Sequence, residues 1–154
     1  MKTNCIRLPL AALALFAASV TVQAQETAAA PAYTISANVG LFSQYIFRGI
    51  SYTQEKPAVQ GGFDVAHESG AYLGIWGTNV SDLALSNATG EIDVYGGYAK
   101  TVGDFTFDVG FLQFIFPGGK LDLVGGGTES LNTLELNAAV TWKFIQLKYS
   151  YAVT

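Results

Sequence analysis

The sequence is poor in the residues that carry most catalytic and metal chemistry. It contains one cysteine, Cys5, one histidine, His67, and no methionine after Met1. His67 lies beside Glu68 in a predicted tight turn, and a metal ion needs several such ligands close together. With one histidine in a turn, no Ser/His/Asp set can be argued. We therefore expect no catalytic residues, no metal site and no cofactor, and we expect that the protein is not an enzyme.

Charge is also scarce, and positive charge most of all. Charged residues make up 13% of the chain, whereas about a quarter is usual for a soluble domain. Without Lys2 and Arg7, which lie in a segment predicted to be removed, six basic residues face 12 acidic ones. A negative chain lacks the basic patch that nucleic acids require, so we expect no nucleic-acid partner.

Long apolar runs are confined to the N-terminus. The run Leu8–Val20 follows Lys2 and Arg7 and precedes a small-x-small site at 22–24. It is shorter than the roughly 20 residues of a membrane-spanning helix, so it predicts a cleavable Sec-type signal peptide. Cleavage removes Cys5, and the mature chain then needs no disulfide and has no catalytic thiol.

The rest of the chain is rich in apolar residues that alternate with polar ones. Such alternation predicts β-strands with one apolar face and one polar face. Seven runs show it, over residues 33–47, 57–66, 71–81, 91–101, 105–116, 131–142 and 144–153. In the run 71–81 the register stays open, because Leu73 and Ile75 compete with Tyr72, Trp76 and Val80 for the apolar face.

The connections between these runs alternate between long and short, which is typical of outer-membrane barrels. The runs also have the length that a tilted strand needs to cross a bilayer. Aromatic residues gather near run ends, at Tyr33, Tyr45, Phe47, Tyr98, Phe105, Phe116 and Trp142. The sequence therefore predicts an all-β fold, an antiparallel up-and-down transmembrane β-barrel. The alternative is a soluble β-sandwich or lipocalin-like barrel, whose apolar face points inward.

Seven strands do not match the even number, eight or more, of bacterial single-chain barrels. An open edge in lipid leaves backbone groups unpaired. We therefore expect seven strands of a larger even-stranded barrel, in a chain that is truncated at its C-terminus or pairs with another chain; truncation is the simpler reading. The predicted organisation is a signal peptide (1–24), a flexible leader (25–32) and an incomplete barrel domain (33–154).

Several short motifs together resemble one protein family. They are SANVGL at 36–41, YIFRGIS at 45–51, PAVQGGFD at 57–64, GIWGTNVS at 74–81, EIDVYGGY at 91–98 and LKYSY at 147–151. This set resembles the uncharacterised proteobacterial Gcw_chp family. The resemblance implies an exported outer-membrane-type β-barrel that continues beyond residue 154, and it lends no functional residues. The glycine-rich stretch 121–128 departs from the family pattern.

The candidate site residues are ionisable groups on the predicted polar faces. Arg48 lies where the first run meets a long loop, and it is expected to face acids such as Asp64 or Asp93 across a lumen. Together with Asp108 and Glu135 these residues form a possible lumen lining or constriction, because opposed charges tune pore selectivity. The alternatives are a structural ion pair, a solvated loop residue, and simple hydration of a small plugged lumen.

Function follows from location in this interpretation. We expect an exported protein of the cell outer membrane, surrounded by its lipid, that acts as a narrow pore or passive route for small solutes. One alternative is a structural or adhesive barrel whose outer loops, 48–56, 82–90 and 117–130, bind a partner. Another is a soluble periplasmic carrier of an apolar ligand. The sequence does not indicate the solute or the oligomeric state.

Overall fold

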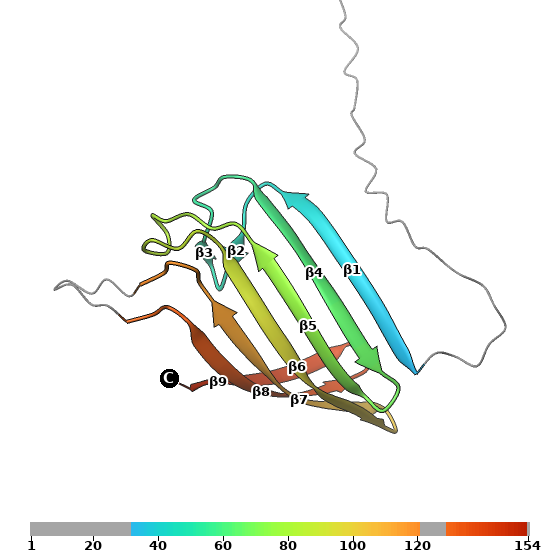
Figure 1. The fold of residues 1–154 in the computed structure, drawn as a ribbon. Coiled ribbons are helices and arrows are strands. Elements are labelled where there is room, and N and C mark those ends of the chain that lie inside the picture. The colour runs from blue at the N-terminus through green and yellow to red at the C-terminus, as the bar shows by residue number, and fades with distance from the viewer. Residues whose placement is uncertain (1–31, 121–128, 154) are drawn as a thin grey trace, which may run out of the picture.

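The computed structural model describes residues 32–120 and 129–153, and over these ranges the protein is all-β. Seven long strands form one antiparallel sheet in which each strand lies beside its neighbour along the chain (Figure 1). They are β1 (Tyr33–Phe42), β4 (Ala58–His67), β5 (Ala71–Thr78), β6 (Glu91–Val102), β7 (Phe105–Ile115), β8 (Thr133–Trp142) and β9 (Ile145–Val153). In the described ranges, no helix has the length and apolarity to cross a membrane.

The seven strands confirm the predicted all-β, antiparallel, up-and-down order. The first run is the exception, because its strand ends at Phe42 and not at residue 47. A separate small hairpin of β2 (Ile46–Phe47) and β3 (Ile50–Ser51) follows, which we call the inner hairpin. The predicted signal peptide, most of the predicted leader and the glycine-rich stretch 121–128 lie outside the described residues.

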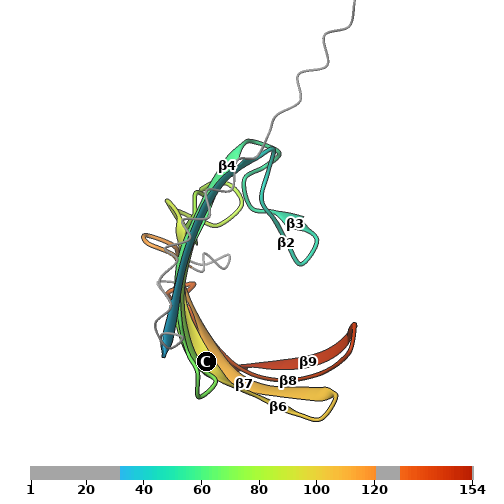
Figure 2. The same ribbon diagram turned by 90° about the vertical axis from the view of Figure 1, so that its right-hand side faces the viewer.

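The sheet is strongly curved, and the inner hairpin lies in its hollow (Figure 2). Contacts of the hairpin segment identify which side chains share the concave face. The Tyr45 ring lies 5.5 Å from the ring of Trp76, and the Phe47 ring lies 5.6 Å from the ring of Phe114. Because side chains alternate along a strand, Leu73 and Ile75 belong to the convex face. This settles the register that alternation left open in β5.

The convex face is apolar and exposed. Val39 is 80% exposed, and Leu147 is 73% exposed. The same face carries Ile35, Leu41, Val59, Phe63, Leu73, Ile75, Ile92, Phe107, Val109, Leu136 and Tyr149, all of them exposed. A water-soluble barrel turns its apolar side chains inward, so this distribution is the reverse of a soluble one.

The sheet is open over the described residues. Its edge strands are β1 and β9, each of which pairs on one side only, with β4 and with β8 respectively. Each strand between these edges pairs with a neighbour on both sides. Because the sheet curves without closing, it forms a half-cylinder. Its hollow, which we call the trough, holds the side chains described next.

Candidate functional site on the concave face

The inner hairpin turns at a two-residue loop, Arg48–Gly49. Both residues have positive φ angles, 48° and 86°, and the pair Phe47–Ile50 closes the loop. Positive φ at both central positions is the signature of a type I′ turn, whose twist suits a tight hairpin. Gly49 adopts this conformation freely, whereas Arg48 is an uncommon residue there. The turn places the Arg48 side chain at the tip of a hairpin that points into the hollow.

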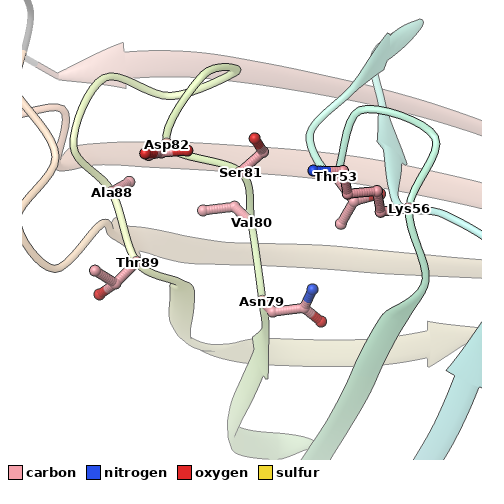
Figure 3. Close-up of a pocket in the computed structure, with 8 residues that line it drawn as sticks. All are labelled: Thr53, Lys56, Asn79, Val80, Ser81, Asp82, Ala88 and Thr89. Atoms are coloured by element: carbon pink, nitrogen blue, oxygen red, sulfur yellow. The ribbon is translucent and has the colours of Figure 1, made fainter.

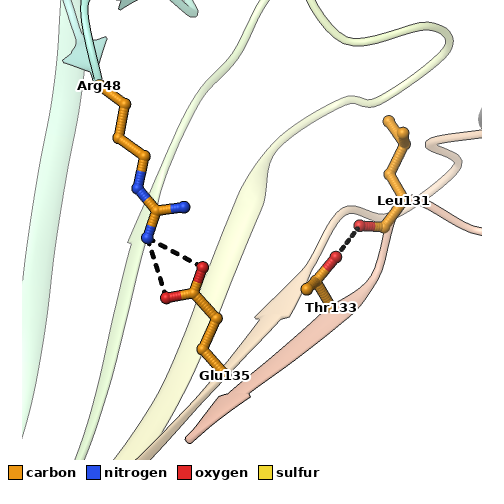
Figure 4. Close-up of polar contacts among 4 residues, drawn as sticks. All are labelled: Arg48, Leu131, Thr133 and Glu135. Carbon is orange, nitrogen blue, oxygen red and sulfur yellow. Dashed lines mark hydrogen bonds and ion pairs between the residues drawn. The ribbon is translucent and has the colours of Figure 1, made fainter. Parts of the chain in front are cut away.

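Arg48 forms an ion pair with Glu135 on β8 (Figure 4). One guanidinium nitrogen of Arg48 lies 2.8 Å and 2.9 Å from the two carboxylate oxygens of Glu135. The Glu135 side chain is buried, while that of Arg48 is largely exposed. The guanidinium also lies 4.8 Å from the centre of the Phe47 ring. This is the one ion pair among the described residues, and it ties the hairpin tip to the opposite side of the trough.

Apolar side chains behind the hairpin form a small plug at the long-loop end of the sheet. Its buried members are Ala88, Phe114 and Phe116. Phe47, Tyr52, Val80, Leu85, Leu112 and Leu131 pack against them. Backbone hydrogen bonds join the loops around it, from Ser81 N–H to the Tyr52 carbonyl and from Thr89 N–H to the Pro117 carbonyl. The loops therefore form one connected layer over this end.

A cavity of about 400 Å³ lies within the loop layer (Figure 3). Its lining includes Thr53, Lys56, Asn79 and Asp82. Thr53 is buried, and its hydroxyl accepts a hydrogen bond from the Tyr45 N–H. Asn79 bonds the backbone on either side of residue 58, so it fastens the loop to β4. These polar groups hold the loops together, and the mixed charges of Lys56 and Asp82 favour no ligand class.

Two buried carboxyl groups, Glu91 and Asp93, lie at the start of β6. Their side chains point to the concave face, and they are 1% and 8% exposed. The Tyr45 hydroxyl donates a hydrogen bond of 3.1 Å to Glu91 Oε1. Glu91 Oε2 and Asp93 Oδ1 have no hydrogen-bond partner among the described residues. Burial and the Glu91 carboxylate raise the pKa of Tyr45 and of Tyr52, so both phenols remain protonated, and the Tyr45 hydroxyl can donate to Glu91.

Replacing Glu91 by glutamine is expected to stabilise the fold. The variant removes a buried acid with an unpaired oxygen, keeps an acceptor for Tyr45, and adds an amide donor two residues from Asp93. We expect the free energy of unfolding to rise by about 1 kcal/mol in a urea titration at neutral pH. Glu135→Gln is the control, and it should lower stability because it weakens the ion pair with Arg48. A destabilised Glu91→Gln variant would contradict this account.

Tyr95 of β6 reaches across Gly74 of β5 to an acid on β4. Its hydroxyl donates a hydrogen bond of 2.5 Å to Asp64 Oδ1 on β4. Gly74 of β5 lies between them, paired with Asp64 on one side and with Tyr95 on the other. A Cβ at position 74 would overlap the Tyr95 ring. The glycine is needed here for close approach rather than for backbone freedom.

A second link of the same kind runs in the opposite direction. Tyr72 of β5 lies across Gly97 of β6, its cross-strand partner, and donates a hydrogen bond of 3.0 Å to Asp108 on β7. A Cβ at Gly97 or at Gly110 would press against the Tyr72 hydroxyl. The two links join four neighbouring strands, β4 to β7, across their concave face.

All five predicted site residues lie on the concave side, but they have different partners. Arg48 contacts Glu135, and not Asp64 or Asp93 as expected, because the hairpin tip reaches across to β8. Asp64 and Asp108 each accept a tyrosine hydroxyl. Asp93 keeps an oxygen without a partner among the described residues. The set is therefore spread over the trough rather than gathered in a ring.

Sequence reasoning missed the roles of Tyr45 and Phe47. Alternation over the run 33–47 predicts that Tyr45 and Phe47 share the apolar face of Tyr33, which is the outer face of the predicted barrel, and this prediction is wrong. The chain leaves the sheet after Phe42, and both rings pack inside the trough. The signal available was Arg48–Gly49, a two-residue turn flanked by apolar residues.

Comparisons with known proteins identify a family but no characterised relative. The family model described as "Bacterial protein of unknown function (Gcw_chp)" matches residues 25–154. No curated protein and no solved structure matched the chain.

Proposed function

We propose that this chain, which belongs to the Gcw_chp family of bacterial proteins of unknown function, forms the wall of an outer-membrane β-barrel with a narrow passage for small solutes. The observation that carries the proposal is the direction of the two faces of the sheet. Exposed apolar side chains cover the convex face, whereas acids, tyrosines and Asn137 line the hollow beside the apolar plug. A lipid-embedded barrel needs this arrangement, because its outer surface meets hydrocarbon and its interior is polar.

The dimensions of the sheet support a membrane location. Its seven long strands have 8 to 12 residues, close to the roughly 9–11 of a tilted transmembrane strand. At the short-turn end, the exposed aromatic residues are Tyr33, Tyr98, Phe105, Trp142 and Phe144. Aromatic girdles mark the interface in such barrels. The proposal requires that the edges of β1 and β9 be paired in the membrane, because hydrocarbon cannot satisfy their backbone groups.

The contents of the hollow support a narrow passage rather than a wide pore. The inner hairpin projects into the hollow (Figure 2), and its residue Phe47 packs against the plug. The Arg48–Glu135 pair sets opposite charges across it. Loops that fold into a barrel and opposed charges at a constriction restrict which solutes pass. This is why we favour a selective route for small solutes over a purely structural barrel.

Fractionation of the exported full-length protein tests the membrane location. We expect recovery in the outer membrane and a different gel mobility before and after boiling. Two neighbouring residues of β8 give matched variants, since Leu136 lies on the convex face and Asn137 on the concave face. Leu136→Lys places a charge in lipid and costs about 2–4 kcal/mol, so we expect much less protein in the membrane. Asn137→Lys should be tolerated.

Two outcomes contradict the proposal. Soluble periplasmic protein with Leu136→Lys fully tolerated would point to the alternative, a soluble carrier. Outer-membrane protein without conductance in planar bilayers would support a structural or adhesive barrel in place of a passage.

A further inference from the structure

A second cavity of about 400 Å³ lies on the concave face, next to the inner hairpin. The residues that line it include Tyr45, Trp76, Tyr95 and Asp93. It is distinct from the loop cavity of Figure 3, which contains none of these residues. Most of its lining residues lie on strands, so strand pairing rather than loop conformation sets their positions.

The strand register brings these groups together. Trp76 of β5 and Asp93 of β6 are direct cross-strand partners, and Tyr95 follows Asp93 by two residues on the same face. Tyr45 directly precedes β2 of the inner hairpin, and its ring lies 5.5 Å from the Trp76 ring at an interplanar angle of 58°. Tyr95 is held by its hydrogen bond to Asp64. The aromatic residues that line the cavity together with Asp93 therefore come from two strands and one loop.

The carboxyl group in this cavity is not neutralised by a protein cation. Asp93 is 8% exposed, and its Oδ1 has no hydrogen-bond partner among the described residues. Arg48 pairs with Glu135. Lys148 of β9 also lines the cavity, but it forms no ion pair with any described residue. Leaving a buried carboxylate without a counter-charge is costly, so a positively charged occupant of the cavity would stabilise the ionised form of Asp93.

We propose that this cavity binds a compact organic ammonium cation, with Asp93 as its counter-charge and Tyr45, Trp76 and Tyr95 as its cage. Aromatic faces attract cations through their quadrupole, and cages of such rings recognise quaternary ammonium groups. A bare metal ion fits less well, because no three His, Cys, Asp or Glu side chains group around a common point in the described ranges. The inference stands on the cavity alone, so binding does not depend on whether the protein conducts.

Choline binding to the full-length protein in detergent tests this site. Trp142→Phe leaves Trp76 as the single tryptophan, and its fluorescence then reports on the cavity. We expect saturable quenching by choline and binding at least about tenfold weaker for 3,3-dimethyl-1-butanol, its uncharged isostere. Glycine betaine, which adds a carboxylate, distinguishes a site for cations from one that also uses Lys148.

The variants separate the cage from the fold. Asp93→Asn should weaken choline binding by about tenfold or more, since it removes the counter-charge. Asp104→Asn, which makes the same change in the distant β6–β7 turn, should leave binding unchanged. Tyr45→Leu should weaken choline binding severalfold, as measured by calorimetry. Lys148→Ala should leave choline binding equal or tighter, because it removes a like charge.

The result can overturn the proposal in three ways. Equal binding of the uncharged isostere would show an apolar site instead. If Asp93→Asn and Asp104→Asn bind choline equally well, Asp93 is not the counter-charge of the site. Absence of saturable binding in protein that circular dichroism shows to be folded β-sheet would exclude the site altogether.

Discussion

Replacing Arg48 by alanine is expected to widen the passage and to make it more selective for cations. Arg48 holds the tip of the inner hairpin against Glu135, and this is the contact that spans the trough. Losing a charged hydrogen bond of this kind costs about 1–3 kcal/mol, reduced here because the Arg48 side chain is largely exposed. The hairpin then opens more often, and Glu135 is left as an unpaired negative charge. Planar-bilayer recordings should show severalfold higher conductance and a reversal potential shifted towards cations.

Two further variants separate charge from tethering. Arg48→Lys keeps the positive charge but loses the guanidinium geometry, so it should show an intermediate conductance. Arg48→Ala combined with Glu135→Ala should keep the high conductance but lose the added cation selectivity. If Arg48→Ala conducts like the original protein, with the same selectivity, the inner hairpin is not the constriction.

Replacing Gly74 by alanine is expected to be one of the most damaging single-methyl changes in the sheet. The added Cβ would overlap the Tyr95 ring. The ring must move, and its hydrogen bond to Asp64 is lost with it. Overpacking of this kind costs about 1–3 kcal/mol, and the lost bond adds about 1 kcal/mol. Urea unfolding of the detergent-solubilised protein, followed by tryptophan fluorescence, should show the midpoint fall accordingly.

Gly77 of the same strand offers the matched control for Gly74. It belongs to the convex face, and a Cβ there would lie 3.3 Å from the Glu91 carbonyl oxygen. We expect Gly77→Ala to cost about 1 kcal/mol or less. The double variant Gly74→Ala with Tyr95→Ala removes both the methyl clash and the ring, so the two costs should be strongly non-additive. Additive costs would mean that the Tyr95 ring does not lie over Gly74.

The sheet was predictable because its signal is local. In β7, Phe105, Phe107 and Val109 alternate with Thr106 and Asp108, and this pattern alone gives the strand and its two faces. Short turns between strands fixed the antiparallel order. In β5 the pattern failed, because Tyr72 and Trp76 are large apolar rings that face the concave side. Each ring carries a polar group and lies opposite a glycine, which explains why both rings fit on the concave side. Only the strand pairing reveals these glycine partners.

The candidate site was less predictable because its contacts join distant residues. Arg48 and Glu135 are 87 positions apart, and alternation says nothing about which positions meet across a trough. The sequence placed Asp93 on the polar face correctly. It gave no reason to unite Asp93 with Trp76 and Tyr45, since that union depends on the β5–β6 register and on a hairpin that leaves the sheet.

The placement of tyrosines over glycines has a consequence for how the chain assembles. A two-residue slip between β5 and β6 would keep every apolar side chain on its own face, so burial alone cannot reject it. Such a slip would set Tyr95 opposite Tyr72 or Trp76 in place of Gly74. Two large rings would then compete for one space, and a glycine elsewhere would face a gap. The placement of large rings opposite glycines therefore disfavours the mispaired register during assembly of the sheet.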